Sequence, residues 1–163
     1  MKRLGILLFG LFIVFNAAAQ TDTSLMYMKF PTIPAFKITK IPDSTGFTKT
    51  DLIKKKPTVF FFFNPDCDHC HQETKNLIAK IELLKEAQII MISILDYQSI
   101  KKFYTDYKIA DYPNITIARE STTFLPAFFK IHSIPDVYVY DKKGNFLEHF
   151  KGSVPVEKIA ALL

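Results

Sequence analysis

The chain has 163 residues, of which 48% are hydrophobic and 23% charged, and it contains only two cysteines. This length fits one compact domain with a core of its own. The net charge of +5 is small and the basic residues are spread along the chain, which argues against a protein that binds nucleic acid or an anionic membrane. We find no internal repeat, no low-complexity tract and no Gly-rich phosphate loop.

The first 19 residues have the layout of a secretory signal peptide. Lys2 and Arg3 give a charged start, residues 4–15 are apolar, and the small residues 17–19 suit a cleavage site, with the cut between Ala19 and Gln20. An uncleaved anchor is the alternative, but residues 4–15 are shorter than the ~20 residues that cross a bilayer. We therefore expect an exported, periplasmic protein that is soluble after cleavage and has no stable membrane insertion.

The segment after the signal peptide is interpreted as a flexible lead over residues 20–32, followed by one domain over residues 33–163. Residues 35–39 and the segment near Phe47 are typical of an added N-terminal β-hairpin.

Residues 58–63 predict a central strand. They read TVFFFF, β-branched or aromatic without alternation, as in a strand buried on both faces. Asn64-Pro65-Asp66 ends this strand, and Asn64 or Asp66 is expected to cap a helix that places Cys67 at its N-terminus. One apolar face of that helix is predicted from the spacing of Leu77, Ile78, Ile81 and Leu84.

The remaining chain alternates between strand and helix patterns, which predicts an α/β fold. The turn at 141–145 contains Gly144, which suits a left-handed position in a hairpin. The expected strands are 88–95, 114–118, 136–140 and 146–150, and the expected helices are 99–107, 123–131 with Pro126 inside, and 156–163.

The two cysteines, Cys67 and Cys70, are separated by two residues. A disulfide that closes so short a loop constrains the unfolded chain very little, so a structural staple is a poor explanation. A structural zinc site normally needs a second pair of ligands, and the four histidines form no second clean pair. Redox chemistry explains the pair better, because the N-terminus of a helix stabilises the thiolate of Cys67, while Cys70 lies one turn further in and is expected to be more shielded.

Three stretches, "NPDCDHC" after the hydrophobic strand, "IPAFKI" before it and "HSIPDVYVYDKKGNF" downstream, resemble the thioredoxin-like thiol-disulfide oxidoreductases, and among them the exported TlpA/ResA-like branch. The resemblance implies a thioredoxin-like fold with a central mixed β-sheet flanked by helices. It also implies that Cys67 is the nucleophile, Cys70 the resolving thiol and Ile134–Pro135 a cis loop whose backbone edge binds the substrate chain.

Two positions depart from the family pattern. Asp66 stands where many thioredoxins have tryptophan, and Phe61 stands where they have a buried acid. The group that deprotonates Cys70 is therefore open among Glu73, His71 and water. Between the cysteines, His69 is expected to stabilise the Cys67 thiolate and Asp68 to oppose it, so both tune the reduction potential.

The resulting hypothesis is an extracytoplasmic thiol-disulfide oxidoreductase with no cofactor beyond the redox-active Cys67–Cys70 disulfide. Its expected partners are protein thiols or disulfides and a thiol-disulfide electron partner, without nucleic acid. The alternative is a copper-binding or metal-delivery protein on the same fold that uses both cysteines and His132. A peroxidase is disfavoured because the threonine three residues before the first cysteine is missing. The three remaining histidines have simple structural interpretations. His71 is expected to be an exposed helix residue, His149 a solvent-facing strand residue and His132 an ordinary loop residue.

Overall fold

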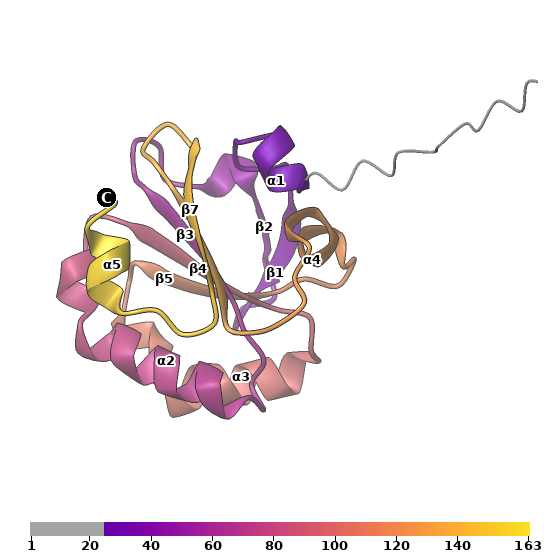
Figure 1. Ribbon diagram of the computed structural model, residues 1–163. Coiled ribbons are helices and arrows are strands. Elements are labelled where there is room, and N and C mark those ends of the chain that lie inside the picture. Colours follow the sequence, from indigo (N-terminus) through magenta and orange to yellow (C-terminus); the bar gives the residue numbers. More distant parts are fainter. Residues whose placement is uncertain (1–24) are drawn as a thin grey trace, which may run out of the picture.

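A seven-stranded sheet forms the centre of the computed structural model, which describes residues 25–163 (Figure 1). The predicted signal peptide lies outside these residues. The strands are β1 (Lys37–Lys40), β2 (Gly46–Thr48), β3 (Thr58–Phe62), β4 (Gln88–Ser93), β5 (Ile115–Arg119), β6 (Asp136–Tyr140) and β7 (Phe146–Lys151), in the spatial order β2-β1-β5-β4-β3-β6-β7. β3, β4 and β5 are parallel, whereas β1, β2, β6 and β7 pair in antiparallel fashion. The predicted mixed α/β architecture is confirmed.

The phenylalanine run makes β3 the middle of two hydrophobic layers. Every residue of β3 is buried, because its side chains alternate between two clusters on opposite faces of the sheet. Phe61 and Phe63 pack into one cluster, and Phe60 and Phe62 into the other. The prediction of a strand buried on both faces is confirmed.

Helices cover both faces of the sheet. They are α1 (Met26–Lys29), α2 (Asp68–Ala79), α3 (Tyr97–Asp106), α4 (Phe124–Phe129) and α5 (Val156–Ala160), with single 3₁₀ turns at Lys49–Asp51, Ile81–Leu84 and Ile109–Asp111. α2, α3 and α5 lie on the face of Phe61, and α1 and α4 lie on the face of Phe60 (Figure 1). None of the helices within residues 25–163 is long and apolar enough to cross a membrane.

Both predicted hairpins are present. Ile38 pairs with Phe47 between β1 and β2, and Val139 pairs with Glu148 between β6 and β7. Gly144 has a φ of +82°, which an L-amino acid with a side chain adopts at a cost, so the turn between β6 and β7 needs glycine there.

The predicted flexible lead over 20–32 is wrong in its described part. Residues 26–29 form α1, and Tyr27 is only 4% exposed because its ring packs against Tyr138 and Phe146. Thr32 also forms an isolated bridge with Asn145. The periodicity of so short a helix carries little signal, and its partners lie more than 100 residues away, so the sequence pattern did not reveal it.

Candidate active site

Cys67 occupies the N-cap position of α2, directly after the turn that ends β3. The predicted cap by Asn64 or Asp66 is wrong, because the Asn64 side chain instead accepts a hydrogen bond from the Asp66 amide, 2.7 Å away. The Cys67 amide donates to the Asn64 carbonyl oxygen at 3.1 Å and so closes the turn. The sulfur of Cys67 thus belongs to the residue that normally supplies a capping oxygen, next to helix N–H groups that have no partner within the helix.

The two cysteines differ in exposure as expected. Cys67 is half-buried and Cys70 is fully buried, and both are free thiols. Burial, reinforced by the neighbouring Cys67 and Glu73, raises the pKa of the Cys70 thiol to about 12. Cys67 is therefore the sulfur that an incoming disulfide can reach, and Cys70 needs help to lose its proton.

Glu73 lies on the same buried side of α2 as Cys70, three residues further along the helix. Its side chain is 2% exposed, and burial raises the pKa of the carboxyl group. The Val154 amide donates to Glu73 Oε1 at 3.1 Å and fixes the position of the carboxylate. Of the three groups left open by the sequence, Glu73 is the one that combines burial, proximity to Cys70 and a raised pKa.

His71 is engaged elsewhere. Its Nδ1 lies 2.6 Å from the Tyr107 hydroxyl, and its ring packs against Phe103 with 5.2 Å between ring centroids. The interpretation of His71 as an exposed helix residue is wrong, because α3 covers one side of its ring. Asp68 and His69, the dipeptide between the cysteines, are both exposed at the start of α2.

The loop before β6 lies next to the cysteine turn. Phe62 at the end of β3 pairs with Asp136 at the start of β6, so Ile134 and Pro135 lie beside the residues that lead into Cys67. Ile134 and Cys67 pack against the same hydrophobic cluster. The Ile134–Pro135 peptide bond is cis, as the family resemblance implied, and a second cis bond at Ile41–Pro42 was not anticipated.

The metal alternative requires His132 to lie beside the two cysteines. Within residues 25–163 there is no group of three or more His, Cys, Asp or Glu residues that could hold a metal ion. His132 is exposed and lines a cavity with Tyr27, Phe129 and His149, not with the two cysteines.

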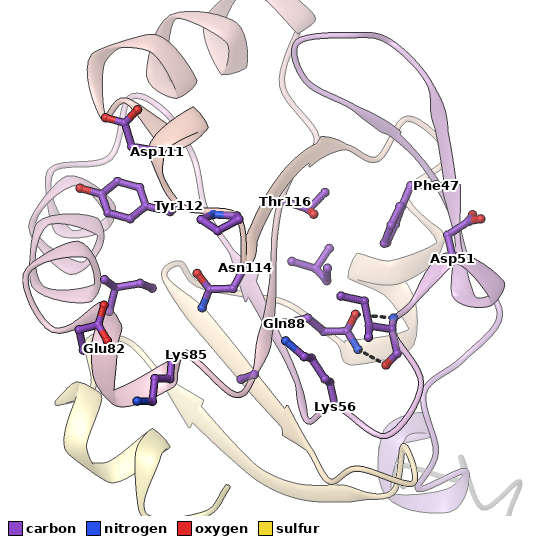
Figure 2. A pocket seen from close by; sticks show the side chains of 15 residues that line it. Phe47, Asp51, Lys56, Glu82, Lys85, Gln88, Asp111, Tyr112, Asn114 and Thr116 are labelled. Atoms are coloured by element: carbon purple, nitrogen blue, oxygen red, sulfur yellow. Dashed lines mark hydrogen bonds between the residues drawn. The ribbon is translucent and has the colours of Figure 1, made fainter.

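A cavity with a volume of about 580 Å³ is remote from the cysteines. It is lined by Gln88 at the start of β4 and Asn114 before β5 (Figure 2). Cys67 follows the opposite end of the parallel strands. The side-chain amide of Gln88 forms hydrogen bonds with the Ile53 backbone at 2.8 and 3.0 Å and with Thr58 Oγ1 at 3.0 Å. The polar atoms of Gln88 in this cavity are therefore used to hold neighbouring segments of the fold together.

One feature near the site was missed at the sequence level. Asp136, directly after Pro135, is 3% exposed and bonded to His149 from the neighbouring strand. The interpretation of His149 as a solvent-facing residue is therefore wrong. The unbroken apolar run Val137–Tyr140 after Asp136 could have indicated that Asp136 begins a strand buried on both faces. Its partner, however, depends on the register of β7, which a single sequence does not specify.

Comparison with known proteins gives one family and several similar structures. A family model described as a thioredoxin-like domain matches residues 48–163. A search of curated protein sequences finds no match.

Three solved structures illustrate the structural similarity. StoA from Bacillus subtilis is 16% identical, with a TM-score of 0.59 over 81% of this chain and 98% of that chain. A secreted Mycobacterium tuberculosis disulfide oxidoreductase homologous to E. coli DsbE is 19% identical, with a TM-score of 0.62 over 77% and 92% of the two chains. Copper-bound ScoI from Arabidopsis thaliana is 15% identical, with a TM-score of 0.63 over 78% and 92%. At these identities the likeness concerns the fold.

Proposed function

The chain belongs to the thioredoxin-like family, and we propose that it is a thiol-disulfide oxidoreductase acting through Cys67 and Cys70. The observation that carries the proposal is the asymmetry of the pair: Cys67 is accessible at a helix N-terminus, and Cys70 is buried beside Glu73. A structural disulfide would not need one reachable and one shielded sulfur, or an acid behind the second.

The reaction consists of two exchanges. The Cys67 thiolate attacks one sulfur of a substrate disulfide, forms a mixed disulfide and releases the first substrate thiolate, which takes up a proton. The Cys70 thiolate then attacks the Cys67 sulfur, forms the Cys67–Cys70 disulfide and releases the second substrate thiolate. Two electrons pass from the cysteine pair to the substrate, and a dithiol partner returns them in a later exchange.

Glu73 is the proposed proton acceptor for Cys70. The family's usual buried acid is replaced by Phe61, which packs in the same cluster as Cys70. Glu73 supplies a carboxylate from the helix side of that cluster, and its raised pKa brings it nearer to the pH at which a general base works well. The thiol proton passes to the Glu73 carboxylate as the Cys70 sulfur attacks.

The proposed substrate-binding edge is the backbone at Ile134 and Pro135. The Pro135 carbonyl oxygen accepts a hydrogen bond from the Gly152 amide at 2.9 Å, which ties this loop to the end of β7. An extended substrate segment can add to such an edge by backbone pairing, with its cysteine placed over Cys67. Protein disulfides are therefore the proposed substrates, and the added β1–β2 hairpin fits the resemblance to the TlpA/ResA-like branch.

The test is reduction of insulin disulfides by the full chain in the presence of dithiothreitol, compared with the uncatalysed rate. The wild-type chain should accelerate reduction, and Cys67→Ser should return it to the uncatalysed rate. A copper titration of the reduced protein runs in parallel. Tight copper binding without insulin reduction would favour the metal-delivery alternative.

We also propose that the protein works outside the cytoplasm, in the periplasm. The charged start, the apolar residues 4–15 and the small residues 17–19 support export. The mass of the protein recovered after secretion in a bacterial host tests this, with cleavage between Ala19 and Gln20 expected. An intact N-terminus would contradict it.

A further inference from the structure

A buried carboxylate lies immediately beside the proposed substrate edge. Asp136 follows Pro135 directly and is 3% exposed. Its neighbours are aromatic: Phe62 is its partner across the strands, and the Tyr138 hydroxyl lies 3.3 Å from Asp136 Oδ2. Because an ionised carboxylate without partners is costly in such surroundings, Asp136 stays in place only while its hydrogen bonds are kept.

His149 on β7 provides the shortest of these bonds. Its Nε2 lies 2.6 Å from Asp136 Oδ1. The strand register pairs His149 with Tyr138 and Asp136 with Lys151, so the histidine reaches its acid diagonally across the hairpin. The imidazole also stacks on the Tyr138 ring, with centroids 4.3 Å apart and planes 8° from parallel.

The second ring nitrogen of His149, Nδ1, contacts a residue of α1. Tyr27 of α1 has its hydroxyl 3.3 Å from His149 Nδ1. An ionised Asp136 only accepts hydrogen bonds, so Nε2 of His149 carries a proton, and in the neutral imidazole Nδ1 accepts from Tyr27. Both ring nitrogens are therefore used, and the orientation of the ring is determined from two sides.

Helix α4 contacts this group of side chains through Tyr138. The Tyr138 hydroxyl lies 3.0 Å from the Phe129 carbonyl oxygen at the end of that helix, and its one proton can be donated to this oxygen or to Asp136 Oδ2. α1, α4, β6 and β7 thus meet around Asp136, on the face of the sheet opposite to Glu73 and Cys70. The hydrogen bonds around Asp136 play no part in the two thiol-disulfide exchanges. They nevertheless hold the residue that directly follows Pro135.

We propose that His149 is a positioning residue for substrate binding: its bond to Asp136, held in orientation by Tyr27, keeps the Ile134–Pro135 edge in the geometry that pairs with a substrate polypeptide. This inference rests on the proposed function. The loop then has two supports, the backbone bond from Gly152 to Pro135 and the side-chain bond from His149 to Asp136. Neither support touches the reacting sulfurs.

The test separates substrate binding from sulfur reactivity in the full chain. His149→Leu should raise KM for insulin about tenfold with kcat unchanged, because a hydrogen bond to a buried charge is lost. Alkylation of Cys67 by iodoacetamide should keep its rate, since that small reagent needs no backbone edge. His149→Gln, whose side-chain amide can still donate to Asp136, should stay within about twofold of wild type.

Two further variants are measured beside His149→Leu. Leu147→Ala, at an exposed position of the same strand, is the matched control and should leave KM unchanged. If His149→Leu fails to fold, Tyr27→Phe removes only the hydroxyl next to Nδ1 and should raise KM about twofold.

Amide hydrogen exchange at residues 131–136 reports on the loop independently of catalysis, and it should become faster in His149→Leu. A wild-type chain without insulin activity would contradict the proposed function, and this exchange measurement would still decide the role of His149. An unchanged KM together with unchanged exchange in His149→Leu would overturn that role, as would an equal loss of insulin reduction and Cys67 alkylation.

Discussion

Glu73 and Cys70 lie three residues apart on the buried side of α2, and burial raises the pKa of both side chains. A thiol whose pKa is about 12 is almost entirely protonated at neutral pH, so it attacks a disulfide slowly unless its proton has an acceptor nearby. The buried carboxylate of Glu73, one helical turn away, is the proposed acceptor. The relationship makes the second exchange, in which Cys70 attacks Cys67, the step most sensitive to Glu73.

Replacing Glu73 with glutamine should slow this second exchange by about 10²-fold at pH 7, the usual contribution of a general base. The rate of Cys67 alkylation should not change. The deficit should shrink as the pH rises, because hydroxide then removes the Cys70 proton. Single-turnover release of the second substrate thiol measures the step. Gln72→Ala, at an exposed neighbouring position, is the control, and a normal release rate in Glu73→Gln would assign the proton to another acceptor.

The same substitution should change how stability depends on pH. The pKa of Glu73 is raised above its unfolded value of 4.5, so between these two values the folded chain holds a proton that the unfolded chain has lost. Stability from this group is therefore complete at low pH and decreases as the pH rises through the raised pKa. Glu73→Gln, which keeps an acceptor for the Val154 amide, should gain stability relative to wild type at pH 7 more than at pH 4. Urea unfolding at both pH values tests this, and an equal difference at both would contradict it.

The dipeptide between the cysteines should set the reduction potential. A positive charge at position 69 would stabilise a Cys67 thiolate and so the reduced form, whereas the negative charge of Asp68 would oppose it. The potential is expected between roughly −120 and −270 mV, and a neutral residue at position 69 should make it more negative by about 30 mV. Asp68→Asn should shift it in the opposite direction. Equilibration with glutathione at fixed pH gives the values, and a more oxidising His69 variant would show that the electrostatic argument has the wrong sign.

The N-terminal helix should contribute to the stability of the domain. Tyr27→Ala removes a buried aromatic ring and should cost about 3 kcal/mol. Met28→Ala, whose side chain is 61% exposed on the same helix, should cost little. Urea unfolding of the two variants distinguishes a docked helix from a flexible lead. Equal stability of both variants and wild type would restore the flexible-lead interpretation.

Much of the fold could be predicted from local patterns. The phenylalanine run after Thr58 is long, β-branched or aromatic and unbroken, so its burial on both faces follows from the residue pattern alone. Cys67 was correctly placed at a helix N-terminus because Asn64-Pro65 stops the strand. The predicted side-chain cap is wrong, because the Asn64 side chain accepts a hydrogen bond from the Asp66 amide within the turn and not from an amide of the helix.

Features that depend on distant contacts could not be predicted. Tyr27 is buried by residues more than 100 positions away, and the Asp136–His149 bond needs the β6–β7 register. Glu73 was named as one of three acceptors, but the choice required knowing that His71 bonds Tyr107. Local sequence specifies elements, whereas pairing across the sheet decides which polar groups meet.

The most direct test of the roles of the two cysteines is the trapping of a mixed disulfide. Cys70→Ser, mixed with oxidised insulin, should accumulate a covalent complex through Cys67 that dithiothreitol releases, because the attacking sulfur is present and the resolving sulfur is missing. Cys67→Ser should form none. Mass spectrometry of the non-reduced mixture identifies the linked cysteine. A complex through Cys70 in Cys67→Ser, or no complex with Cys70→Ser, would contradict the assignment of Cys67 as the nucleophile.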